Sequence, residues 1–120
     1  MQNFFVSFFS HVKKAFFYSV AGLRHAYRHE FAFRWEIYFA IPLLFVGCYI
    51  GRTAAEKCLL CGSILLILIV ELINTAIETT VNRISLERHA LSAQAKDLGS
   101  AAVFIAILNA AIIWFIIILL

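Results

Sequence analysis

Three long apolar runs dominate this 120-residue chain and leave room for little else. They lie at about residues 31–50, 58–81 and 98–120, and short charged segments separate them. A helix that crosses a bilayer needs roughly 20 mostly apolar residues, so each run is long enough to span a membrane. Because 63% of the residues are hydrophobic and the mean hydropathy is +0.92, the composition predicts one all-α membrane domain and no separate soluble domain.

The N-terminal segment, about residues 4–29, has a different pattern. Its apolar residues recur at steps of three and four, which is helical spacing: Phe5, Phe9, Val12, Phe16, Val20, Leu23 and Tyr27. Basic residues occupy other positions of the same segment: Lys13, Lys14, Arg24 and Arg28. This pattern predicts a basic amphipathic helix that lies in the membrane interface. Because Lys13 and Lys14 follow an apolar stretch instead of preceding it, we expect no signal peptide and a chain that is mature from Met1.

The distribution of lysine and arginine predicts the orientation of the chain. Of the 10 basic residues, only Arg52 and Lys57 lie in the connection between the first two spans; the others lie near the N-terminus or the second connection: Lys13, Lys14, Arg24, Arg28, Arg34, Arg83, Arg88 and Lys96. The positive-inside rule places the richer side in the cytoplasm. We therefore expect a multi-pass membrane protein with a cytoplasmic N-terminus and an outward-facing polar turn at Gly51–Lys57. A net charge of +3, carried beside apolar runs, suits anionic lipid and not nucleic acid.

A polar stripe runs along the second half of the middle span. At about 100° per residue, Glu71, Asn74 and Glu78 fall within an arc of roughly 60°, and Asn82 continues the stripe. An ionisable side chain costs about 2.5–3.5 kcal/mol in the hydrocarbon region even on insertion scales. The stripe therefore indicates a functional site, although hydrogen-bonded contacts between helices would also account for it.

The first and third spans begin with polar residues at the same membrane level. Glu30 and Arg34 begin the first, while Lys96, Asp97 and Ser100 begin the third. Paired carboxylates can hold Mg²⁺ and leave positions free for phosphate oxygens, and a nearby lysine can meet the remaining phosphate charge. The residues thus predict a polar site at the cytoplasmic interface, with the side-chain types that can bind Mg²⁺ and phosphate.

The remaining features have simpler interpretations. All three cysteines lie in or beside apolar runs, so we expect no disulfide framework, and Cys58-x-x-Cys61 is assigned to packing. Because Trp114 lies within the third apolar run, its position alone predicts a lipid-facing or packing residue. Ser85 is a candidate helix N-cap, and residues 82–97 are expected to be a helical extension or an interfacial loop. No P-loop and no soluble protein kinase motif is present.

Two segments closely resemble the bacterial diacylglycerol kinase family of small membrane enzymes. They are the run Glu71-Leu-Ile-Asn74-Thr-Ala-Ile-Glu78-Thr-Thr-Val-Asn82-Arg83 and the run Ala95-Lys96-Asp97-Leu98-Gly99-Ser100-Ala101-Ala102. The resemblance extends upstream through Tyr18-Ser19, Gly22-Leu23-Arg24 and Glu30-x-Ala-Phe-Arg34-x-Glu36, so it covers nearly the whole chain. Composition and spacing alone would stop at a membrane protein with a polar interfacial site.

The resemblance implies transfer of the γ-phosphate of ATP to diacylglycerol, which gives phosphatidic acid, in a homotrimer whose sites lie between subunits. It implies that Glu71 is the general base and that Glu30 and Glu78 hold Mg²⁺. The implied nucleotide contacts are Tyr18, Glu87, His89, Lys96, Asp97 and His11. The residues implied to line the site or the lipid pocket are Arg34, Glu36, Asn74, Ser100 and Trp114. This chain departs from the family at Asn82, where Asp is usual, and at His11, where Arg is common.

Two alternatives stay open. An undecaprenol kinase would have the same fold and chemistry, although Glu36 after Arg34 favours the diacylglycerol branch. A protein of another class, such as a non-catalytic membrane interaction protein or a proton conduit, could also be built around Glu71 and Glu78. A conduit needs polar groups across the whole membrane, and the outer half offers mostly Leu, Ile, Ala and Cys with Ser63.

Overall fold

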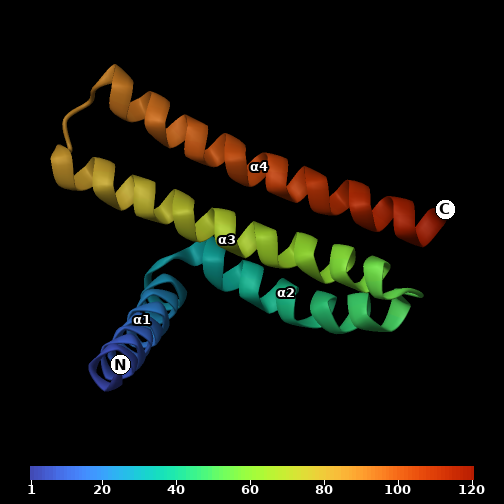
Figure 1. Ribbon diagram of the computed structural model, residues 1–120. Coiled ribbons are helices and arrows are strands. Elements are labelled where there is room, and N and C mark those ends of the chain that lie inside the picture. The colour runs from blue at the N-terminus through green and yellow to red at the C-terminus, as the bar shows by residue number, and fades with distance from the viewer.

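A computed structural model describes residues 1–120 as four helices joined by short connections (Figure 1). They are α1 (Gln2–His29), α2 (Phe31–Ile50), α3 (Ala54–Ile84) and α4 (Ala90–Leu119). The last three are long and apolar enough to cross a membrane, as the three apolar runs predict. Helix α3 packs against both α2 and α4, so it carries most of the contacts that hold the chain together.

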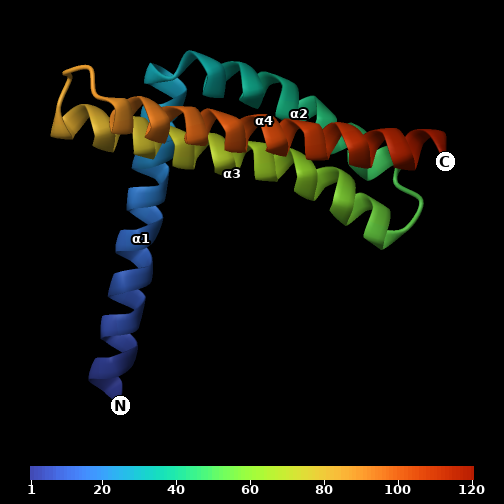
Figure 2. The same ribbon diagram turned by 90° about the horizontal axis from the view of Figure 1, so that it is seen from above.

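Helix α1 points away from the bundle, as Figure 2 shows. The corner lies at Glu30, whose extended backbone (φ −104°, ψ 110°) ends α1 and begins α2. Across the corner, the hydroxyls of Tyr27 in α1 and Tyr38 in α2 lie 2.8 Å apart and join the two helices. Glu30 therefore lies at the junction of α1 and α2, and the tyrosine contact holds the two helices together beside it. The placement of α1 in the interface stays a prediction.

The connection between α2 and α3 is shorter than expected. We predicted a polar turn over Gly51–Lys57, but α3 begins at Ala54 and only residues 51–53 are non-helical. The Thr53 hydroxyl accepts a hydrogen bond from the Glu56 amide at 3.1 Å, and the Glu56 carboxylate accepts one from the Arg52 amide at 2.7 Å. These two hydrogen bonds cap the beginning of α3, so residues 54–57, including the charged Glu56 and Lys57, are helical.

The connection between α3 and α4 corrects a second expectation. Ser85 is not a helix N-cap: its amide donates to the Val81 carbonyl and ends α3. The N-cap of α4 is His89, whose Nδ1 accepts a hydrogen bond from the Leu91 amide at 3.1 Å. Residues 82–97 therefore combine the end of α3, a five-residue loop and the beginning of α4.

The interior of the bundle is small and made largely of small residues. Ala40, Ile64 and Ala110 form its centre, and only 13 of 120 residues are buried. Small side chains let helices approach closely, which is how membrane helices pack in the absence of a hydrophobic driving force. The large apolar side chains mostly point outward, so lipid or further protein must cover them.

Candidate functional site

The site is centred on a buried carboxyl group in α3. Glu71 is 8% exposed and Asn74, one turn further on, is 7% exposed. The charge of Glu71 acts on Glu36 of α2, and the charges of Glu78 and Glu30 act on Glu71 in turn. Four glutamates from α2, α3 and the corner at Glu30 thus gather in one region, and two of them, Glu71 and Glu78, belong to the polar stripe. No group of three acidic, histidine or cysteine side chains is arranged to hold a metal ion by itself.

Asn74 is held against the backbone of α4 at Gly99. A Cβ placed on Gly99 would collide with Asn74 Oδ1 and come within 3.2 Å of its Cγ. Asn74 Oδ1 is itself buried and has no hydrogen-bond partner in the chain. Gly99 therefore gives α4 the room to pack directly on the amide of Asn74. No structural role for Gly99 was inferred from the sequence, because the two residues lie on different helices.

A hydrogen bond links α3 to α4 at the edge of the polar region. Lys96 Nζ donates to Asn82 Oδ1 at 2.8 Å. Asn82 therefore acts as a hydrogen-bond acceptor for a cation, which an amide oxygen performs without a negative charge. The contact holds the Lys96 side chain beside α3 instead of free in solvent.

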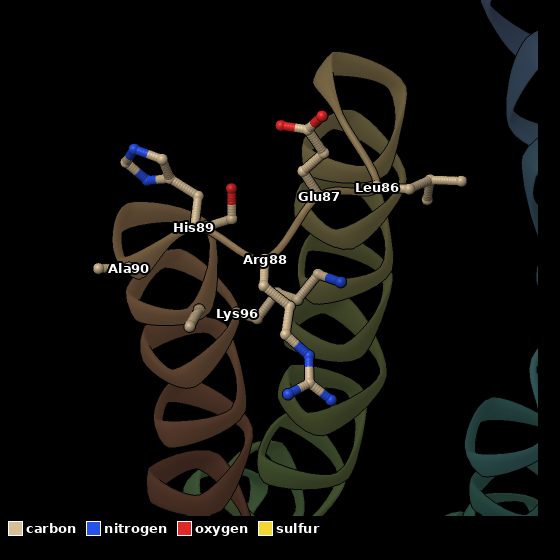
Figure 3. A pocket seen from close by; sticks show the side chains of 8 residues that line it. Leu86, Glu87, Arg88, His89, Ala90 and Lys96 are labelled. Atoms are coloured by element: carbon tan, nitrogen blue, oxygen red, sulfur yellow. The ribbon is translucent and has the colours of Figure 1, made fainter.

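An open pocket of about 510 Å³ lies at the connection between α3 and α4 (Figure 3). Its lining residues are Leu86, Glu87, Arg88, His89, Ala90, Ser92, Ala93 and Lys96. Three of these, Glu87, His89 and Lys96, are among the predicted nucleotide contacts. In Figure 3 the Arg88 side chain extends along the helices and the Lys96 side chain reaches from α4 toward α3, whereas those of Glu87 and His89 point to the opposite side of the loop. Arg88, for which the sequence predicts no nucleotide contact, also lines this pocket.

Other predicted nucleotide contacts do not line this pocket. Tyr18 and His11 lie on α1 and are exposed, and Asp97 is exposed on α4. Ser100, predicted to face the lipid substrate, is exposed one turn beyond Lys96. A single chain therefore brings together only part of the predicted nucleotide site.

A second, mainly apolar pocket of about 260 Å³ lies between the three long helices. Its lining residues are Glu36, Phe39, Ala40, Leu43, Ile64, Ile67, Leu68 and Ile107. Glu36 is the one charged residue in this lining, and its Oε2 is buried without a hydrogen-bond partner. An apolar cavity with one convergent polar group can orient an amphipathic ligand. Arg34, which precedes Glu36 by two residues, is half-buried and does not line the pocket.

Trp114 lies in the packing between α3 and α4. Its Nε1 donates to Ser63 Oγ at 3.2 Å, and the Ser63 hydroxyl donates to the Leu60 carbonyl at 2.8 Å. Trp114 also packs against the core centred on Ala40 and Ala110. These contacts agree with the packing interpretation, and a role for Trp114 in lipid binding stays a prediction.

A family model described as Prokaryotic diacylglycerol kinase matches residues 17–118. The chain belongs to this family. The match spans α2, α3 and α4 and the second half of α1, so it includes all of the candidate site residues except His11.

Curated relatives agree with the family model. The chain is 46% identical over 97 residues to the diacylglycerol kinase of Haemophilus influenzae, covering 81% of this chain and 82% of that protein. It is 45% identical over 106 residues to the diacylglycerol kinase of Escherichia coli K12, covering 88% of this chain and 87% of that protein. The diacylglycerol kinase of Helicobacter pylori 26695 is 37% identical over 106 residues, covering 88% and 83%. The resemblance to the bacterial diacylglycerol kinases is thus confirmed.

Proposed function

We propose that the chain is a membrane kinase that transfers the γ-phosphate of ATP to the hydroxyl of diacylglycerol and releases phosphatidic acid and ADP. Family membership and the names of the curated relatives support this activity. The observation that carries the proposal is the buried Glu71, 8% exposed, among three further glutamates within an apolar helical bundle. Burying an ionisable carboxyl group inside an apolar membrane bundle costs free energy, so its presence indicates a functional role beyond helix packing.

Glu71 is the general base in this proposal. It lies seven residues before Glu78, which corresponds to about 10 Å along the helix at 1.5 Å per residue. That depth suits a hydroxyl of a lipid whose acyl chains remain in the membrane. Glu71 accepts the hydroxyl proton while the oxygen attacks the γ-phosphorus directly and ADP leaves, so no phosphoenzyme is needed.

Glu30 and Glu78 would hold Mg²⁺ together with the nucleotide phosphates. Carboxylate oxygens are suitable donors for this ion, which takes one or two protein carboxylates and completes its shell with phosphate oxygens and water. Two half-buried glutamates whose charges both act on Glu71 fit that requirement, and no third protein ligand is needed. The bound ion would neutralise charge on the phosphates.

The open pocket at the connection between α3 and α4 would bind the nucleotide through Glu87, His89 and Lys96. The hydrogen bond from Lys96 to Asn82 supports a fixed position for the lysine charge near the phosphates. Asp97, Tyr18 and His11 would complete the contacts. Because these three residues are exposed in the single chain, we assign their engagement to a homotrimer with sites between subunits.

The apolar pocket would receive part of the lipid. Glu36 would orient the glycerol part at one end, and the alkyl lining would contact an acyl chain. Arg34, Asn74 and Ser100 would line the approach between this pocket and the nucleotide, with Trp114 on the acyl-chain side. The buried, unpartnered oxygens of Glu36 and Asn74 support this assignment, because a substrate hydroxyl or ester could meet them.

The asymmetry of basic residues supports an inner-membrane location with α1, Asn82 and Lys96 on the cytoplasmic side, where ATP is available. The exposed aromatic side chains of α1 include Phe8, Phe9 and Phe16. They support placement of this helix in the interface, with its lysines toward the headgroups.

The test is phosphate transfer by the purified protein in mixed micelles. Labelled ATP is supplied with diacylglycerol or with undecaprenol, and the labelled lipid is identified. We expect label in phosphatidic acid. Label in undecaprenyl phosphate alone would assign the chain to the other substrate of the same chemistry, and label in neither lipid would support a non-catalytic membrane protein.

A further inference from the structure

Two of the three cysteines meet across the interface between α2 and α3. Cys48 Sγ of α2 and Cys61 Sγ of α3 lie 3.4 Å apart. The Cys61 thiol also approaches the Leu44 carbonyl at 3.5 Å. All three cysteines are free thiols. The sequence predicts only packing for Cys61, because the spacing along the chain does not reveal that Cys48 lies opposite it.

The close approach is a property of the helix packing at Gly47. A Cβ on this buried glycine would lie 3.1 Å from Leu60 Cβ and 3.4 Å from Cys61 Sγ. The missing side chain therefore lets the two helices come together next to Cys48. The hairpin of residues 51–53 is short and capped by Thr53, so the alignment of α2 with α3 is fixed close to this point.

We propose that Cys48 and Cys61 form a dithiol that an external disulfide, such as oxidised glutathione, converts to an intramolecular disulfide linking α2 to α3. One thiol loses its proton and attacks a sulfur of the external disulfide, which releases one glutathione thiol. The second cysteine then attacks its partner's sulfur in the mixed disulfide and releases the other glutathione thiol. The two thiol protons end on the two released glutathiones, so two electrons pass from the protein to the oxidant.

The position of the pair predicts what the cross-link leaves unchanged. Cys61 precedes Glu71 by ten residues, which is about 15 Å along α3. The two helices already touch at this level, so closing the bond needs only a small movement. We therefore expect the cross-linked protein to keep its phosphate transfer. Under the proposed orientation, the pair lies toward the outer side, where disulfides persist in bacteria.

The test uses the full chain in membranes and in detergent. Protein is treated with oxidised glutathione, remaining thiols are blocked with N-ethylmaleimide, and intact mass and non-reducing peptide maps are recorded. We expect the loss of two hydrogens, one remaining blocked thiol at Cys58, and a cross-linked peptide that contains Cys48 and Cys61. The matched control Cys58→Ser should form the same cross-link, while Cys48→Ser and Cys61→Ser should each abolish the cross-linked peptide.

Several results would overturn the proposal. They are a map that joins Cys58 to Cys61, a disulfide only between chains, or three thiols that remain blockable after oxidation. Phosphate transfer by each variant under reducing conditions shows that the protein is folded, so a missing cross-link then reports the geometry of the thiols. Loss of the native protein's activity on cross-linking would contradict the expected tolerance of the site.

Discussion

Replacing Gly99 with alanine should disturb the contact that joins α4 to the centre of the site. The added methyl group would collide with Asn74 Oδ1 and lie 3.2 Å from Asn74 Cγ and 3.9 Å from its Cα. Overpacking of this kind costs about 1–3 kcal/mol. Alanine is otherwise preferred to glycine within a helix by about 1 kcal/mol. The net loss in free energy of unfolding should therefore be about 0–2 kcal/mol for Gly99→Ala, which is about 1–3 kcal/mol relative to a glycine-to-alanine change without a collision.

A matched control separates the collision from the general effect of alanine. Gly62 also lies in a membrane-spanning helix, and a Cβ on it would meet nothing within 4 Å. Gly62→Ala should be neutral or stabilising by up to about 1 kcal/mol. The variants are compared by equilibrium unfolding in detergent micelles and by turnover with diacylglycerol. Because Asn74 must move to admit the methyl group, Gly99→Ala should lose turnover as well as stability.

A double substitution tests the stated cause. In the Asn74→Ala background the colliding oxygen is gone. Gly99→Ala should therefore cost less stability there than it does in the native background. Equal unfolding free energies for Gly99→Ala and Gly62→Ala, or strict additivity in the double variant, would refute the assignment of the collision to Asn74.

Three further substitutions test separate contacts. Glu78→Gln should weaken binding of Mg·ATP and lower turnover together, and an unchanged Mg²⁺ dependence would exclude Glu78 as a ligand. Asn82→Asp keeps the acceptor for Lys96 and adds an exposed charge whose interaction is worth about 0–1 kcal/mol, so turnover should change less than about fivefold. A hundredfold gain in turnover would show that Asn82 impairs catalysis in this chain. Tyr38→Phe removes the hydrogen bond to Tyr27 and should lower the free energy of unfolding by about 0.5–1.5 kcal/mol, and adding Tyr27→Phe should then cost little more.

The sequence predicts the three long apolar helices well, because the apolar length of a spanning helix is set by bilayer thickness. The predicted helix boundaries are less accurate, since hydropathy marks the apolar part of a helix and not its full length. The third apolar run begins near residue 98, whereas α4 begins at Ala90 and includes a polar first part. The prediction of Ser85 as a helix N-cap is wrong because it rests on side-chain type alone. The loop of residues 85–89 places His89 at the N-cap of α4 instead.

The shared face of Glu71 and Asn74 follows from their helical spacing, and both side chains are buried in the structure. Contacts between helices were not predictable, because they depend on how α2 and α4 align with α3. The packing of Gly99 on Asn74, the bond from Lys96 to Asn82 and the approach of Cys48 to Cys61 all belong to this second class. The contributions of α1 also lie beyond periodicity, since Tyr18 is exposed in the single chain.

The turnover of Glu71→Gln is the most direct test of the proposed mechanism. Glutamine keeps the size and hydrogen bonding of the buried side chain but cannot accept the proton. A positioned general base contributes about 10²–10⁴ in rate, so turnover with diacylglycerol should fall by that factor while Mg·ATP binding and assembly persist. Glu56→Gln, at the opposite end of α3, is the matched control and should retain turnover. Near-normal turnover of Glu71→Gln would contradict the account and leave proton removal to the phosphate or to water.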